Sequence, residues 1–134
     1  MNDTEYKLYR ALYFYKKTRD GNSYQEVMEA LNLCLQEDCS GWLAARVETH
    51  GGSEMAVPGV MKDTDGKSYY ILCPAEDDMS QMEEEGLSKL HVNLRAVCGS
   101  VIREGAIDGI CLNPWDGGCF ITSEDIETMM KLVK

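Results

Sequence analysis

The sequence has no long hydrophobic run, and its first residues carry no export signal. Residues 1–21 open with polar and acidic side chains and never reach the uninterrupted apolar core that a signal peptide requires. No later run is long enough to span a bilayer. We therefore expect a cytoplasmic protein without membrane contacts.

The sequence also lacks close pairs of cysteine or histidine. Its six cysteines are Cys34, Cys39, Cys73, Cys98, Cys111 and Cys119, and no two of them form a C-x-x-C pair. An even cysteine count predicts disulfides in a short secreted chain, but here the export signal is missing. Most of the cysteines lie among apolar residues, so we interpret them as small buried hydrophobes. Structural zinc usually needs paired ligands, and we predict neither a metal site nor a cofactor.

Catalytic motifs are missing as well. The sequence has no G-x-S-x-G, no Walker loop and no G-x-G-x-x-G. The D-x-D-G of residues 63–66 is reminiscent of a calcium loop, but Ser68 and Pro74 stand where an EF-hand needs its glycine and its glutamate. We interpret this stretch as a hairpin turn. We do not expect an enzyme.

Positive charge is scarce overall. The chain has 23 acidic and 13 basic residues, which gives a formal net charge of -10. That charge repels phosphate backbones, so we predict no nucleic-acid partner. Residues 1–20 are the exception, because Lys and Arg outnumber Asp and Glu there.

What remains is typical of one globular domain over residues 1–134. Apolar residues make up 44% of the chain and charged residues 27%. We predict a helical pair over 1–38 and a sheet-forming part over 41–134. Asp3 or Thr4 is the expected cap of the first helix, and Ser23, with Glu26 three residues later, is the expected start of the second.

The first helix has two apolar stripes. One stripe contains Leu8, Ala11, Leu12 and Tyr15, and the other contains Tyr6, Tyr9 and Tyr13. Either both stripes face the same domain, or the tyrosine stripe meets another chain.

Short extended runs follow, separated by turn residues. We expect strands over 42–48, 54–62 and 68–74 in a meander, with Trp42 as a core or edge anchor. Residues 88–113 then show extended, helical and extended patterns, which predict a parallel βαβ unit. A C-terminal helix begins at Thr122 or Ser123. The predicted fold class is α+β, with a mixed sheet of about five to six strands, two N-terminal helices, a crossover helix and a C-terminal helix packed on it.

The segment 109–122, GICLNPWDGGCFIT, predicts two paired strands around a turn. We expect Asn113 to be extended because it precedes Pro114, while Asp116, Gly117 and Gly118 reverse the chain. Ile110 and Leu112 should share one face, as should Cys119 and Ile121. The turn accounts for every residue of the loop except Trp115.

These strands resemble the SseB-like N-terminal domain family (enhanced serine sensitivity protein B). The likeness rests on GICLNP, FITSEDI, MAVPG, DGKSYYILCP and VNLRAV. It covers about residues 41–134, and ILCPAED replaces the phenylalanine-threonine pair that is usual in the family. The resemblance implies a bacterial mixed α/β domain without established catalytic residues.

The leading hypothesis is a non-catalytic soluble domain that acts through contacts with a protein partner or with itself. The candidate contact residues are Tyr6, Tyr9, Tyr13, Asn113, Pro114, Trp115 and Asp116. The alternative for Trp115 is that its ring folds back over the sheet. A rival hypothesis is a thiol-dependent enzyme or carrier using Cys39, Cys111 or Cys119. A third is a small-ligand pocket between the sheet and the helices.

Overall fold

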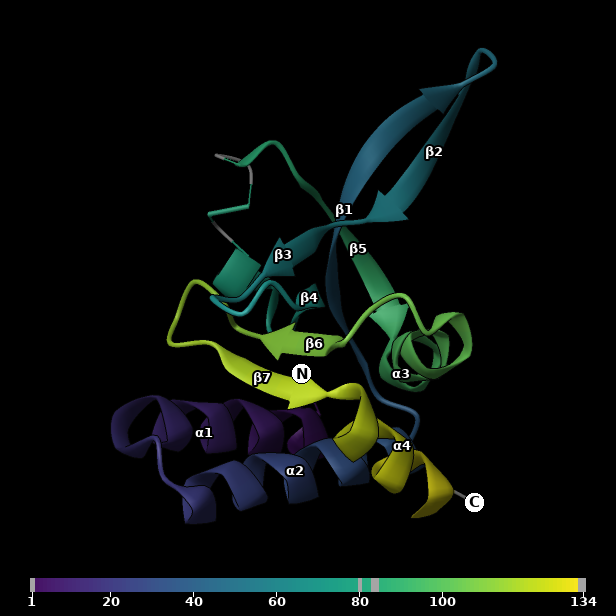
Figure 1. Ribbon diagram of the computed structural model, residues 1–134. Coiled ribbons are helices and arrows are strands. Elements are labelled where there is room, and N and C mark those ends of the chain that lie inside the picture. The colour runs from purple at the N-terminus through teal and green to yellow at the C-terminus, as the bar shows by residue number, and fades with distance from the viewer. Residues whose placement is uncertain (1, 80, 83–84, 133–134) are drawn as a thin grey trace.

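The described residues of the protein form four α-helices and a mixed β-sheet, arranged as Figure 1 shows. The computed structural model describes residues 2–79, 81, 82 and 85–132. Over these residues the sheet has seven strands, one or two more than predicted, and the α+β class is confirmed. None of the described helices is both long and apolar enough to cross a membrane.

The two N-terminal helices are α1 (Asp3–Thr18) and α2 (Gly21–Gln36). Asn2 caps α1 through a capping box with Glu5, so the predicted caps Asp3 and Thr4 lie inside the helix. The chain leaves α1 at Arg19, whose φ of 53° is left-handed, and Asp20 caps α2 by accepting from the backbone N–H of Ser23 at 2.8 Å. The predicted start at Ser23 was therefore wrong, because Asp20 provides the cap three residues earlier.

The strands form one sheet in the order β2-β1-β4-β6-β7, with β3 also pairing with β4 and β5 with β1. Their bounds are β1 Ser40–His50, β2 Ser53–Pro58, β3 Val60–Lys62, β4 Ser68–Cys73, β5 Ser88–Asn93, β6 Gly109–Leu112 and β7 Cys119–Thr122. The single strand predicted over 54–62 is divided at Gly59, whose N–H donates to the Ala44 carbonyl at 2.8 Å. β2 therefore pairs with β1, and β3 with β4.

The predicted βαβ unit is present, but its strands are not neighbours. α3 (Leu94–Glu104) connects β5 to β6. β1 and β4 lie between β5 and β6 in the sheet. β1 is antiparallel to both β5 and β4, and β4 is parallel to β6. β5 and β6 therefore run in the same direction. α4 (Ser123–Leu132) follows β7 directly.

The helices cover one face of the sheet, where the main core lies (Figure 1). Ile110, Leu112, Cys119 and Ile121 all point into this core, as the alternation predicted. The opposite face carries a smaller core. It consists of Ala44, Ile71, Cys73, Met79, Met82 and Leu87. Met79 ends the 3-10 helix η1 (Glu76–Met79), which lies over this face.

The outer halves of β1 and β2 project from the sheet as a two-stranded ribbon (Figure 1). Residues 46–56 are all exposed, whereas Leu43, Ala44 and Ala45 are buried. Gly51 and Gly52 form the turn with φ values of 59° and 86°, which suit a tight hairpin and favour glycine.

Candidate functional site

The outward side of α1 carries the three tyrosines predicted as a stripe. Tyr6, Tyr9 and Tyr13 are 52%, 37% and 47% exposed. A helix turns about 100° per residue. The centre of the stripe is therefore turned by roughly 110° from Leu8 and Leu12, which are buried in the main core. We call these three residues the tyrosine stripe. Over the described residues, none of the three tyrosines is part of the main or the smaller hydrophobic core.

The rings of the stripe contact neighbouring side chains along the helix. Tyr6 and Tyr9 stack with centroids 6.3 Å apart, and Tyr13 meets Phe14 edge-on at 6.0 Å. The Lys17 ammonium lies 4.3 Å from the Tyr13 ring centroid, and hydrogen bonding to Lys17 together with its charge lowers the pKa of Tyr13. The surface is thus both aromatic and basic.

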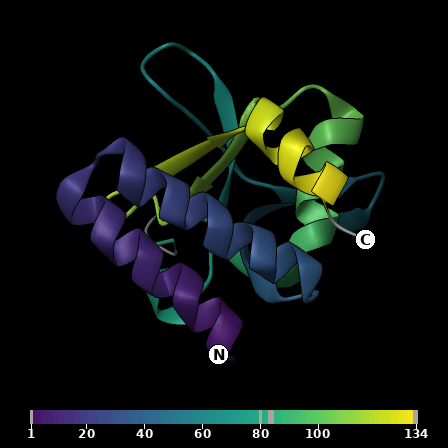
Figure 2. The same cartoon turned by 90° about the horizontal axis from the view of Figure 1, so that it is seen from below.

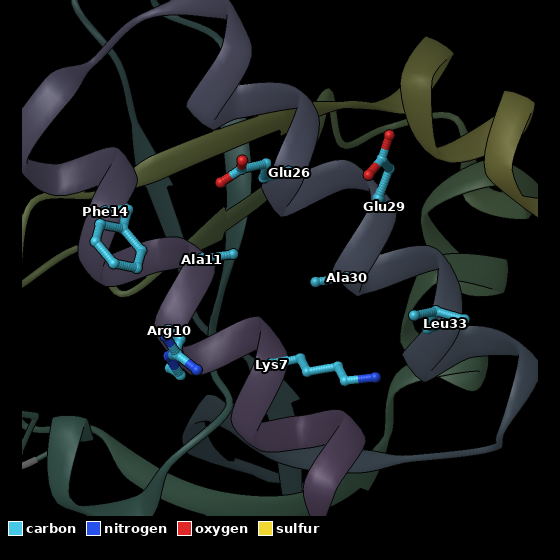
Figure 3. A pocket seen from close by; sticks show the side chains of 8 residues that line it. All are labelled: Lys7, Arg10, Ala11, Phe14, Glu26, Glu29, Ala30 and Leu33. Carbon is cyan, nitrogen blue, oxygen red and sulfur yellow. The ribbon is translucent and has the colours of Figure 1, made fainter.

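A groove of about 280 Å³ lies between α1 and α2 beside the stripe (Figure 3). It is lined by Lys7, Arg10, Ala11 and Phe14 from α1 and by Glu26, Glu29, Ala30 and Leu33 from α2. Ala11 and Ala30 point toward each other between the two helices, and the Lys7 side chain extends from α1 toward α2 (Figure 3). We call the tyrosine stripe and this groove together the α1–α2 face. Figure 2 views the molecule from the side of α1 and α2, so that these two helices lie in front of the sheet.

The two sides of the groove differ in charge. Lys7 and Arg10 stand on α1, and Glu26 and Glu29 stand on α2. Among the described residues, none of these four side chains has an ion-pair partner within 4.0 Å. Phe14 and Leu33 are 46% and 40% exposed beside them. Unpaired charges around exposed apolar side chains are typical of contact surfaces.

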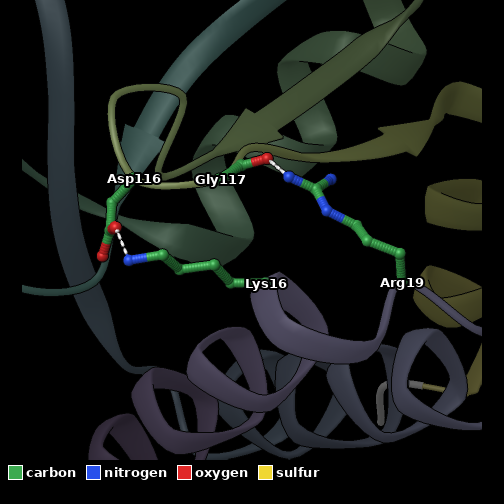
Figure 4. Close-up of polar contacts among 4 residues, drawn as sticks. All are labelled: Lys16, Arg19, Asp116 and Gly117. Carbon is green, nitrogen blue, oxygen red and sulfur yellow. Dashed lines mark hydrogen bonds and ion pairs between the residues drawn. The ribbon is translucent and has the colours of Figure 1, made fainter.

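The predicted contact loop, residues 113–118, lies against the C-terminal end of α1 (Figure 4). Lys16 forms an ion pair with Asp116, and the Arg19 guanidinium donates to the carbonyls of Gly117 and Gly118. The carboxylate of Asp116 is therefore already used within the chain.

Asn113 differs from the prediction. It is buried and left-handed, with a φ of 51°, rather than extended. Its carbonyl accepts from the N–H groups of Asp116 and Gly118, and its own N–H donates to the Leu72 carbonyl at 3.1 Å. These three backbone hydrogen bonds outweigh the preference of a residue before proline for extended geometry.

Trp115 lies back against the smaller core, which was the alternative considered for it. Its side chain is partly buried against that core, and its Nε1–H donates to the Glu85 carboxylate at 3.1 Å. Pro114 beside it is half-buried. The structure therefore brings Asn113, Pro114 and Trp115 together in one loop beside the C-terminal end of α1.

All six cysteines are buried and free of disulfides. Burial raises the pKa of Cys111 and of Cys119 to about 12. Cys39 is 3% exposed. A reactive thiol needs exposure and a lowered pKa, so these positions match the interpretation as small hydrophobes better than the rival thiol hypothesis.

A further cavity that the sequence did not predict lies beside Trp42. About 350 Å³ in volume, it is lined by Glu5, Ser40, Trp42, Pro74, Ala75, Glu76 and His91. Trp42 pairs with His91 across β1 and β5, and their rings stack at 4.6 Å. Only the register between two strands far apart in sequence brings these rings together.

The carboxylates of this cavity already have partners. Glu5 accepts from the N–H of Ser40 at 3.0 Å and from the N–H of Asn2, and Glu76 pairs with Lys89 at 2.6 Å. Among the described residues, no cluster of three His, Cys, Asp or Glu side chains could hold a metal ion. The cavity therefore offers few free polar groups to a ligand.

Comparisons with protein-family models, curated proteins and solved structures give no match for this chain. The assignment to the SseB-like family stays a prediction.

Proposed function

We propose that this chain is a non-catalytic interaction domain that binds another protein chain through its α1–α2 face. The observation that carries the proposal is the exposure of the tyrosine stripe on the outer side of α1, turned away from the buried Leu8 and Leu12. Three exposed tyrosines next to one another form one continuous aromatic surface, which exposed side chains scattered singly do not. Tyrosine is also enriched among the residues that dominate binding energy in interfaces.

The rest of the molecule supports contact rather than chemistry. The candidate thiols are buried with raised pKa values, and the carboxylates of the Trp42 cavity are held by Ser40, Asn2 and Lys89. The other predicted contact loop is tied to α1 and to the smaller core. The α1–α2 face combines exposed aromatic rings with unpaired charges.

Site-specific photo-crosslinking tests the proposal. A benzophenone side chain replaces Tyr13 in the full chain, which is produced in its native host and irradiated. The matched control carries the same group at Ile102, which is exposed on α3 away from this face.

We expect a discrete adduct from position 13 that is absent from position 102. The adduct should be lost when Tyr6→Ala and Phe14→Ala are added. Equal labelling at both positions, or none at position 13, contradicts the proposed function.

A further inference from the structure

The α1–α2 face carries opposite charges on its two helices. Lys7, Arg10 and Lys17 lie on the exposed side of α1, while Glu26 and Glu29 lie on the exposed side of α2. A complementary partner must present acidic groups over α1 and basic groups over α2. Charge complementarity of this kind selects partners and orientations in interfaces.

The chain itself presents the required pattern. Two copies can meet face to face around a two-fold axis that runs along the groove, parallel to the helices. This axis places α1 of each copy over α2 of the other, so that Lys7 and Arg10 face the Glu26 and Glu29 of the second copy. Such an interface uses the same patch on both subunits.

The other two-fold arrangement is disfavoured by charge. An axis perpendicular to the helices would place α1 over α1, which brings the basic side chains Lys7, Arg10 and Lys17 of the two copies to the same side of the interface. Like charges placed together cost interaction energy, more so where water is excluded. Electrostatics therefore distinguishes between the two symmetric arrangements.

The apolar groups fit the favoured axis as well. Phe14 and Leu33 are exposed beside the groove, and a two-fold axis along the groove brings each of them toward its counterpart in the second copy. The small side chains Ala11 and Ala30 between α1 and α2 allow the helices to approach. An apolar seam flanked by opposite charges is the packing scheme of helical bundles.

We propose that the partner of the α1–α2 face is a second copy of this chain, with α1 of each copy lying antiparallel over α2 of the other. This identity of the partner rests on the contact function assigned above to the same face.

Two charge-reversal variants of the full chain test the arrangement by sedimentation velocity. One variant is Lys7→Glu with Arg10→Glu, and the other is Glu26→Lys with Glu29→Lys. We expect the wild type to dimerise at low ionic strength and each variant alone to self-associate at least roughly tenfold more weakly. A 1:1 mixture should dimerise again, because every reversed helix then faces its complement.

A control variant, Lys62→Glu with Lys67→Glu, lowers the net charge by the same amount as Lys7→Glu with Arg10→Glu. Its two substitutions lie on the exposed β3–β4 hairpin. It should dimerise like the wild type. Circular dichroism of each variant alone checks that it is folded, so that a loss of association can be assigned to the interface.

Three results would overturn the self-association: a wild type that stays monomeric over the concentration range, a mixture that stays monomeric, or a control that dissociates equally. These results leave the proposed function standing if position 13 still crosslinks to a different protein. If no adduct forms at position 13, both the proposed contact function and the proposed self-association are contradicted.

Discussion

Replacing Gly109 by alanine should destabilise the protein strongly. Gly109 begins β6 and lies opposite Thr122 of β7. A Cβ atom at this position would stand 2.0 Å from the Ile121 carbonyl oxygen and 3.0 Å from both the Ile121 carbonyl carbon and the Thr122 Cα. All three are backbone atoms, so no side-chain rotation relieves the overlap.

The cost follows from what must move. β7 has to shift by about 1.4 Å to bring the Ile121 carbonyl oxygen from 2.0 Å to an ordinary contact of 3.4 Å, and the Ile121 side chain, which is fully buried, shifts with it. Losing two backbone hydrogen bonds of the short β6–β7 ladder and straining the core together cost roughly 2–4 kcal/mol. In a domain of this size, about 3 kcal/mol lowers Tm by about 10 °C.

Gly99→Ala is the matched control. Gly99 lies inside α3, where a Cβ would meet only the flexible Arg103 side chain at 3.4 Å. The same substitution there should stabilise the protein by about 0.5–1 kcal/mol.

Urea unfolding followed by circular dichroism measures both variants. If Gly109→Ala stays within about 1 kcal/mol of the wild type, or if the two variants shift in the same direction, the close approach of β6 and β7 is not what requires glycine.

Three further predictions concern single side chains. Iodoacetamide should label Cys111 and Cys119 about a thousandfold more slowly in the native protein than in the denatured protein at neutral pH. The reason is that a pKa of about 12 leaves correspondingly less of each thiol as the reactive thiolate. Equal labelling rates, measured by mass spectrometry, would refute this. Hydrogen bonds from Ser23 lower the pKa of Asp20, so its stabilisation is present at neutral pH and is lost as the pH falls below about 4. Asp20→Asn keeps the cap without titrating, so its unfolding free energy should match the wild type at neutral pH and decline less in acid. Trp115→Phe should remove an emission band that is blue-shifted in the native state by the smaller core; a native spectrum like that of free tryptophan would contradict the packing.

Local patterns predicted much of the fold because they depend on neighbours in sequence. The two N-terminal helices, the C-terminal helix and the shared face of Ile110 and Leu112 all follow from spacing and conformational preference. The tyrosine stripe was found in the same way.

The remaining features depend on contacts between distant segments. Asn113 is left-handed because of a turn and a bond to Leu72, and β2 separates from β3 because Gly59 bonds to Ala44. The Trp42–His91 stack needs the register of β1 against β5. No local pattern contains these pairings, so sequence reasoning could not place them.

The ribbon formed by the outer halves of β1 and β2 divides a single strand into two parts with different local stability. The inner part of β1 is held between β4 and β5, whereas the ribbon is held only by its own cross-strand bonds. Amide hydrogens near the ribbon turn should therefore exchange with solvent through brief local opening, while those near Leu43 should exchange only on global unfolding. One strand thus belongs to two cooperative units, and the boundary lies near Ala45.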